Sequence, residues 1–272
     1  MPVVRRAVKV ASAAADRFRA PAAGVVVLLY HRVGGGSSLE IDLDAARFDD
    51  QIAAVARSGR AVTLSAALTQ LAGRSGPPPD AATSVVVTFD DGTADFVDVA
   101  VPILVRHRVP ATLYVATDFV EGGHAFPADG RPVSWSSLRD ACATGFVDVG
   151  SHSHTHALFD RISPSAAADE LDRSVGLIGE RLDRPAQDFA YPKAVPAHAD
   201  VERLVRDRFR SAALAGTRVN GWHTTDPYRL ARSPIQVSDG MRFFEHKLAG
   251  GMALEDAWRR AINRVRYAKA NT

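Results

Sequence analysis

Short apolar runs, rich in β-branched residues, alternate along this chain with longer segments of helical periodicity. Such runs of four to seven residues predict buried strands. The expected strands are Val25–Tyr30, Val85–Phe89, Pro110–Ala116, Phe146–Gly150 and Asp188–Tyr191. The expected helices are Asp44–Ser58, Leu64–Leu71, Phe96–His107, Ser136–Thr144, Ser165–Leu182 and Leu254–Ala268. Alternation of strands and helices is typical of βα units, so we expect a single-domain α/β fold with parallel strands.

The segments outside this alternation divide the chain. Residues 1–23 are basic and alanine-rich, and we expect a basic N-terminal helix there. Residues 24–240 hold the βα alternation, and residues 241–272 are expected to form a C-terminal helical extension. Within the central part, Arg74–Ser84 contains three consecutive prolines and is expected to be an exposed loop. Glu121–Pro132, rich in Gly and Pro, is expected to be a loop at the rim of the fold.

The composition of the chain limits the classes of protein, partner and cross-link that fit it. The chain has 272 residues, 46% hydrophobic and 24% charged, which suits one globular domain with a large core. A net charge of +2 indicates neither a nucleic acid nor an acidic membrane as a partner. The single Cys142 excludes an internal disulfide and is expected to be a small core residue.

The N-terminal segment is a weak match to a signal peptide. Asp16, Arg17 and Arg19 interrupt what would be its apolar core. No run in the chain approaches the roughly 20 apolar residues of a membrane-spanning helix. A cytoplasmic location is therefore favoured over a secreted one, and no stable membrane span is expected.

The strand Val85–Phe89 runs directly into two carboxylates, Asp90 and Asp91, and then Gly92. Two adjacent carboxylates raise each other's pKa unless a cation or hydrogen bonds compensate, and a metal ion is a common remedy. Successive residues of a strand point to opposite sides, so one carboxylate can bind a metal while the other acts as a base. The structural alternative is a solvated Asp-Asp-Gly turn.

A second polar motif follows the strand Phe146–Gly150. It holds His152, His154 and His156, and histidine is the commonest neutral metal ligand. At a spacing of i, i+4, His152 and His156 would share one face of a helical turn. Two imidazoles and a carboxylate leave metal positions open for water and substrate, which is typical of a catalytic site. The alternative is a polar loop that is rich in histidine.

These groups all come directly after predicted strands. His31 follows Val25–Tyr30 in the same way. In a parallel (β/α) architecture, functional groups gather at the carboxyl ends of the strands, so the agreement supports a barrel. His31 has either a direct role or a place in the packed wall of the site.

Three motifs together resemble the polysaccharide deacetylase family, the carbohydrate esterases with a nodulation-protein-B homology domain. They are TFDDG at Thr88–Gly92, GSHSHTH at Gly150–His156 and FAYPK at Phe189–Lys193. The likeness extends from about Leu28 to about Ala213. It implies a distorted (β/α) barrel over residues 24–240 and an acetylated carbohydrate as substrate.

The resemblance also implies residue roles. Asp90 would be the general base, and Asp91, His152 and His156 would hold a divalent metal. Zinc is the default for two imidazoles and a carboxylate, although such sites also accept cobalt, nickel or iron. A backbone N–H near Tyr191 would bind the oxyanion. The implied substrate contacts are Tyr191, Pro192 and His154.

The implied activity is hydrolysis of the amide bond of an N-acetylated sugar polymer or glycan. The same chemistry of a metal and an activated water would also serve an O-acetyl esterase or a cyclic-amide hydrolase. A further alternative is a catalytically weak, carbohydrate-binding relative.

The alternative of a catalytically weak relative rests on departures from the family pattern. The family arginine that precedes the motif proline is missing, since Ala190 and Tyr191 stand there, and Ala194 replaces the usual glycine. No Leu-x-His segment is found near the C-terminus to supply the general acid. The histidines that could replace it are His31, His154 and His223.

Arg232 is the candidate replacement for the missing arginine. It lies in Tyr228–Ile235, where a polar turn leads towards a short apolar segment late in the barrel order. We expect Arg232 to reach the strand ends and keep Asp90 ionised, because an opposite charge lowers the pKa of a carboxylate. The alternative is an arginine exposed at the surface, as most arginines are.

Overall fold

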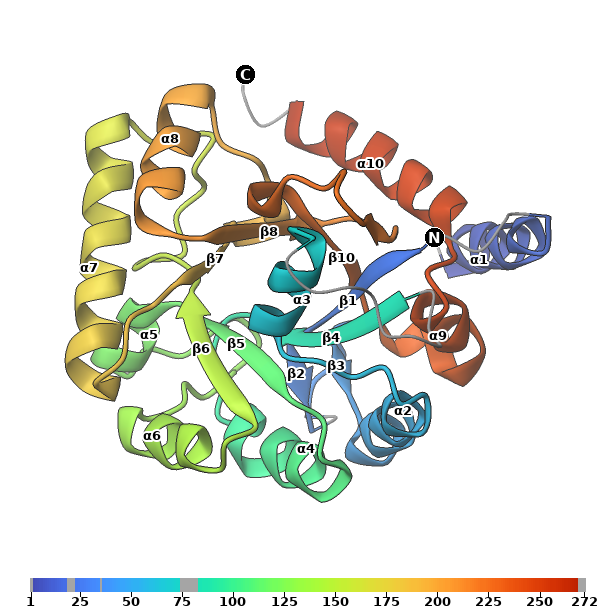
Figure 1. The fold of residues 1–272 in the computed structure, drawn as a ribbon, viewed down its shortest axis with the longest axis horizontal. Coiled ribbons are helices and arrows are strands. Elements are labelled where there is room, and N and C mark those ends of the chain that lie inside the picture. Colours follow the sequence, from blue (N-terminus) through green and yellow to red (C-terminus); the bar gives the residue numbers. More distant parts are fainter. Residues whose placement is uncertain (1, 19–22, 35, 74–82, 269–272) are drawn as a thin grey trace.

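Parallel strands form a closed barrel at the centre of the computed structural model, which describes residues 2–18, 23–34, 36–73 and 83–268 (Figure 1). Seven parallel strands follow one another around the barrel, and the last pairs with the first. In order they are β1 (Gly24–Tyr30), β4 (Thr83–Phe89), β5 (Ala111–Val115), β6 (Val147–Ser151), β7 (Asp188–Ala190), β8 (Ser211–Ala215) and β10 (Leu230–Pro234). This architecture confirms the predicted α/β barrel in a single domain.

Helices surround the barrel and connect its strands. They are α2 (Ala45–Arg57), α3 (Leu64–Leu71), α4 (Val101–His107), α5 (Thr117–Gly122), α6 (Trp135–Ala143), α7 (Pro164–Leu182) and α8 (Ala199–Arg208). Three further helices are α1 (Pro2–Asp16), α9 (Gly240–Leu248) and α10 (Ala253–Ala268). Asp44, Thr63 and Ser163 cap α2, α3 and α7, each accepting a hydrogen bond from a backbone N–H of the first turn.

Several short elements complete the fold. One turn of π-helix, η1 (Phe96–Ala100), leads into α4, and three 3-10 turns are η2 (Pro192–Ala194), η3 (Pro227–Arg229) and η4 (Val237–Asp239). The strands β2 (Arg32–Val33) and β3 (Asp42–Leu43) pair with each other outside the barrel. The strand β9 (Asn220–Gly221) pairs antiparallel with β1.

The two faces of each barrel strand pack against different partners. On β1, Val26 and Leu28 belong to the large core cluster shared with the surrounding helices. Val25 and Val27 instead pack with residues of α3 in a separate cluster, which closes one end of the barrel (Figure 1). Since α3 covers the end where the strands begin, polar side chains can gather only at the end where the strands finish.

The structure differs from the predicted elements in several places, and the barrel strand β8 and the helices α5 and α8 were not predicted at all. The strand predicted from Val85 begins at Thr83, so the end of the predicted loop Arg74–Ser84 belongs to β4, while residues 74–82 lie outside the described residues. The predicted helix Phe96–His107 begins with the π turn η1. The segment Tyr228–Ile235, predicted to hold a polar turn, is largely the strand β10, which pairs with the edge of β1 and closes the barrel.

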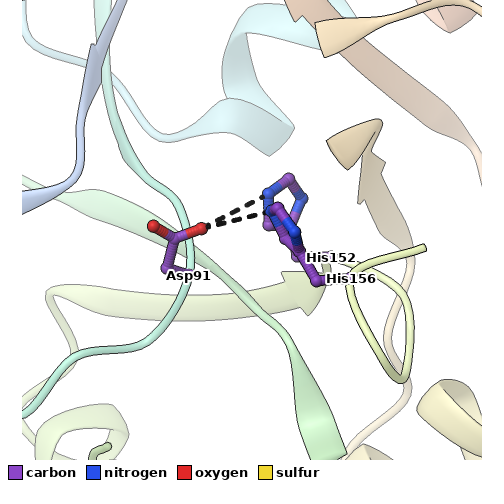
Figure 2. A group of neighbouring side chains, drawn as sticks. All are labelled: Asp91, His152 and His156. Carbon is purple, nitrogen blue, oxygen red and sulfur yellow. Dashed lines mark ion pairs between the residues drawn. The ribbon is translucent and has the colours of Figure 1, made fainter. Parts of the chain in front are cut away.

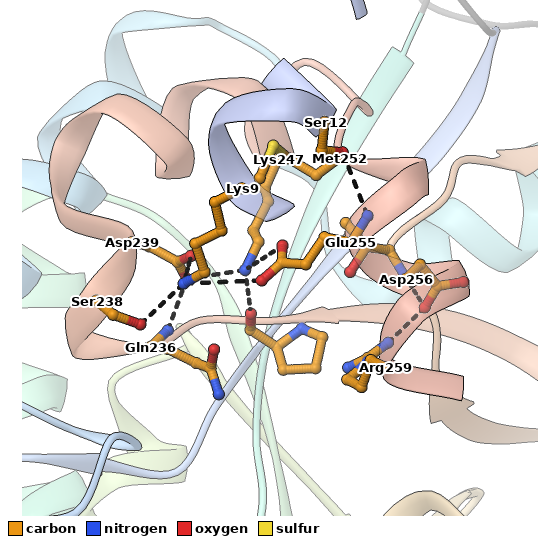
Figure 3. Close-up of polar contacts among 12 residues, drawn as sticks. Lys9, Ser12, Gln236, Ser238, Asp239, Lys247, Met252, Glu255, Asp256 and Arg259 are labelled. Carbon is orange, nitrogen blue, oxygen red and sulfur yellow. Dashed lines mark hydrogen bonds and ion pairs between the residues drawn. The ribbon is translucent and has the colours of Figure 1, made fainter. Parts of the chain in front are cut away.

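The N-terminal helix α1 packs against α9 and α10 beside the barrel (Figure 1). A buried charge cluster, formed by Lys9, Asp239, Lys247 and Glu255, fixes this contact (Figure 3). Lys9 Nζ lies 2.6 Å from Asp239 Oδ1, and Lys247 Nζ lies 2.8 Å from Asp239 Oδ2. The two ammonium groups and two carboxylates balance, which makes their burial tolerable. None of the described helices is long and apolar enough to cross a membrane.

Candidate active site

Asp90 directly follows β4. It is held by Arg232 of β10, and β1 lies between these two strands. Arg232 Nη1 lies 2.6 Å from Asp90 Oδ1, and Arg232 Nη2 lies 2.8 Å from Asp90 Oδ2. Strand alternation explains why these two side chains meet. Val86 and Leu230 both face the interior of the barrel. Asp90 and Arg232 follow them by an even number of residues and so point to the same side. The pair is a bidentate, charge-assisted contact inside the barrel.

Arg232 is fully buried, so the surface alternative for this residue is wrong. Its Nε donates to the carbonyl of Leu214 at 3.1 Å, and its guanidinium carbon lies 5.2 Å from the ring centre of Tyr114. The carboxylate of Asp90, a carbonyl and an aromatic face together compensate the buried charge. Burial raises the pKa of Asp90, but Arg232 and His152 outweigh it and hold that pKa at about 2.

Asp91 points towards two imidazoles, as Figure 2 shows. Its Oδ1 lies 3.7 Å from His152 Nε2 and 3.5 Å from His156 Nε2. One ligand atom from each of the three residues lies within 4.8 Å of the others. The backbone at Asp91 is left-handed, with φ of 74°. His152 Nε2 also lies 3.8 Å from Asp90 Oδ2, so it faces both carboxylates.

The hydrogen bond of His152 and the lowered pKa of His156 suit a metal. His152 donates from Nδ1 to the carbonyl of Ala190 at 2.7 Å, which leaves Nε2 free as a ligand towards Asp91. Burial, followed by the neighbouring His152, lowers the pKa of His156 to about 4, so this imidazole is neutral at neutral pH. Metal ligands must be deprotonated, and a carboxylate with two imidazoles is a ligand set that fits zinc and similar divalent ions.

The backbone that carries these histidines is a loop, so the predicted helical turn from His152 to His156 is wrong. Ser153 and His156 both have left-handed φ values, of 66° and 61°. Glu170 on α7 holds the loop, because its carboxylate accepts from the backbone N–H groups of His154 and Thr155 at 2.9 and 2.8 Å. Sequence reasoning missed Glu170, since a glutamate on a helix is ordinarily a solvated residue.

His31, another predicted site residue, lies beside the Asp pair. His31 lies close enough to Asp90, Asp91, Arg232 and His152 to interact with their charges. Burial is the main cause that lowers its pKa, and its Nδ1 is buried without a hydrogen-bond partner among the described residues. His31 is thus part of the same polar group.

The two other candidate general acids, His154 and His223, lie outside this polar group. His154 turns to Thr117, with 3.0 Å between its Nδ1 and Thr117 Oγ1, and to Asp118, with 3.6 Å between Nε2 and Oδ1. His223 lies at the other end of the barrel, where its backbone N–H bonds to Leu71 of α3. The structure therefore leaves His31 as the candidate general acid nearest to the Asp pair.

Tyr191 and Pro192, the predicted substrate contacts, are both buried. The Tyr191 ring packs edge-on against Phe189 with 5.0 Å between ring centres, and its hydroxyl has no hydrogen-bond partner in the described part of the chain. The backbone N–H of Tyr191 bonds to Ala213, so it is already used within the barrel.

Known proteins match the part of the chain that carries these residues. The family model for polysaccharide deacetylase matches residues 78–207, which include both the Asp pair and the histidine loop. This part of the chain resembles the polysaccharide deacetylase family. A chitooligosaccharide deacetylase of Bradyrhizobium sp. (strain ANU 289) is 31% identical over 159 residues, which are 56% of this chain. The match spans 61% of that relative's length.

Solved structures of other proteins share the barrel. IcaB from Ammonifex degensii superposes with a TM-score of 0.71 at 24% identity, over 83% of this chain and 97% of that one. The Streptococcus pyogenes deacetylase PplD, solved in complex with acetate, superposes with a TM-score of 0.68 at 20% identity, over 78% and 92% of the two chains. At these identities the likeness concerns the fold.

Proposed function

We propose that this protein is a metal-dependent hydrolase that removes acetyl groups from an N-acetylated sugar polymer or glycan. The observation that carries the proposal is the convergence of Asp91, His152 and His156 beside an ionised Asp90. These ligands would hold one divalent ion, with zinc as the default. When bound, the metal supplies a Lewis acid, which polarises the acetyl carbonyl and acidifies water.

The residues of the chain supply the proton transfers. Asp90 keeps lone pairs free beside its bonds to Arg232 and would accept the proton of the attacking water. His31 would carry a proton to the departing amine, since it is the histidine beside the Asp pair that holds no predicted ligand role. Arg232 would position Asp90 and keep it ionised rather than touch the substrate.

The substrate class rests on the chitooligosaccharide deacetylase that this chain resembles. Oligomers of N-acetylglucosamine are therefore the first substrates to test. The contact between Arg232 and Asp90 supports an active enzyme over a weak binding relative, because the missing motif arginine was the main observation behind that alternative.

The test is acetate release from N-acetylglucosamine oligomers by the purified protein, with and without a chelator, together with its metal content. We expect acetate release that the chelator abolishes and that zinc or cobalt restores. Release of acetate only from O-acetylated sugars would contradict amide hydrolysis. Activity that survives complete metal removal would contradict the metal-dependent route.

A further inference from the structure

The large hydrophobic side chains that stay exposed in the described part of the chain are not scattered over the barrel. They are Val4, Val10, Phe18, Val237 and Leu254, and Phe18 is 91% exposed. The first three belong to α1 and the turn after it, while the other two lie in η4 and in the first turn of α10. Both η4 and α10 contact α1. Apolar side chains that cluster on a surface mark an interaction site, whereas single ones need no explanation.

The buried charge cluster fixes the rotation of α1 about its axis (Figure 3). Lys9 Nζ donates to Ser238 Oγ at 2.9 Å as well as to Asp239, and the hydroxyl of Ser12 accepts from the backbone N–H of Glu255. The inner face of the helix is therefore determined. The opposite face is exposed, and its apolar members are Val4, Ala7, Val10, Ala11 and Ala14. With Phe18, this exposed apolar face extends along the whole helix, about 22 Å for its 15 residues.

The charges beside the exposed apolar face are basic. Arg6 and Arg17 are both exposed, and no partner within the described residues neutralises them. Arg5 lies 3.4 Å from Glu40, so that pair is neutral. The only acidic residue of α1, Asp16, turns inward and accepts from a backbone N–H at the start of α10. An apolar helix face with a basic border is typical of a helix that lies in the interface of an anionic membrane.

A second copy of the chain fits this face less well. Two such faces would bring arginines near arginines, and the face offers no carboxylate to offset them. We propose that α1 docks the protein on an anionic membrane surface. Val4, Val10 and Phe18 enter the headgroup region, and Arg6 and Arg17 meet the lipid phosphates. This docking does not depend on the proposed hydrolase activity.

The experiment is sedimentation of the full chain with vesicles of phosphatidylcholine, either alone or mixed with phosphatidylglycerol. We expect binding to the mixed vesicles only, and release at high salt because salt screens exposed charges. Arg6→Gln and Arg17→Gln should each weaken the vesicle affinity about fivefold. Arg108→Gln and Arg173→Gln remove the same charge from exposed positions elsewhere and should leave the affinity unchanged. Melting curves confirm that every variant is folded.

A second measurement tests the apolar contact. Phe18→Ser should weaken vesicle binding, and Phe18→Trp should restore it and shift its fluorescence to shorter wavelength on mixed vesicles. The proposal is wrong if the native chain stays in the supernatant with mixed vesicles, or if the control arginines weaken binding as much as Arg6 and Arg17 do. It is also wrong if Phe18→Ser leaves vesicle binding intact but changes the oligomeric mass in vesicle-free solution, which would make this face a protein–protein interface.

Discussion

Asp90 and Asp91 are neighbours in the chain, yet only Asp90 is hydrogen-bonded to Arg232. Asp90 accepts two bonds from Arg232, whereas Asp91 faces the imidazoles of His152 and His156. Replacing each carboxylate by an amide should therefore have different consequences, although the two changes are chemically identical.

Asp91→Asn should lose both metal and activity, while Asp90→Asn should lose activity and retain metal. The first change removes a proposed ligand, so we expect metal affinity to fall about 100-fold or more, beyond the usual cost of losing an outer-shell partner. Metal content after dialysis and acetate release provide the measurements. His154→Ala is the control that should keep its metal, because His154 turns to Thr117. Equal metal loss in Asp90→Asn and Asp91→Asn would refute the division of roles.

Arg232 should matter for both stability and pH dependence. The pKa of Asp90 falls from 3.8 to about 2 in the fold, so this carboxylate contributes stability that is fully present above pH 3.8 and is lost as pH falls towards 2. Arg232→Met leaves a buried carboxylate without its cation and should cost about 3–5 kcal/mol in urea unfolding. The double variant Arg232→Met/Asp90→Asn should recover most of that loss, since it removes both charges.

The same substitution should change the pH profile of kcat/KM. Without Arg232 the pKa of Asp90 rises, so the base becomes protonated at higher pH and the acid limb should move up by about one unit, or about 1.4 kcal/mol. An acid limb that does not move in a folded Arg232→Met protein would remove Arg232 from the mechanism.

At the scale of elements, α1 is joined to the barrel domain by charge rather than by apolar packing alone. Lys9 is fully buried between Asp239 and Glu255, and Asp239 lies in η4, directly after the strand that carries Arg232. Loss of one member of such a cluster leaves an uncompensated charge inside the protein.

Lys9→Met should therefore lower the free energy of unfolding by about 3 kcal/mol or more, measured as a shift of the urea midpoint. Arg5→Gln is a matched control on the same helix. Its partner Glu40 is 45% exposed, and such surface pairs contribute about 1 kcal/mol or less. A Lys9→Met protein as stable as Arg5→Gln would show that the buried cluster does not hold α1.

On the scale of the whole molecule, the proposed ligands join two parts of the barrel. Asp91 follows β4, while His152 and His156 follow β6, and β5 lies between these strands. A bound ion would connect these segments only in the folded state and so would stabilise the whole domain.

Zinc at about 100 times its dissociation constant should stabilise the protein by about 2.7 kcal/mol and raise Tm by roughly 5–10 °C. Scanning calorimetry of the metal-free protein with added zinc measures this shift. The His156→Ala protein is the control and should show little change. A similar rise in both proteins would indicate that zinc binds elsewhere.

Local patterns in the sequence were sufficient for much of the fold. Short apolar runs predicted five of the barrel strands, and the positions of Asp90, Asp91 and His152 after those runs indicated where polar groups would gather. The strands β8 and β10 were missed. Leu230–Pro234 is short and contains a buried arginine, which the pattern assigns to a surface turn. The overall charge of +2 also gave no indication of a basic border on α1, since a sum over the chain contains no information about which face a charge lies on.

The sequence by itself determined the alternation of strands and helices and the residue types at the strand ends, because periodicity and propensity act between near neighbours. Only the tertiary structure decided the pairs. Arg232 meets Asp90 across 142 residues, the carbonyl of Ala190 orients His152 across 38, and Lys9 reaches Asp239 across 230. Each of these contacts depends on the register of the closed barrel and on the helices packed beside it, which bring together groups that no local pattern connects.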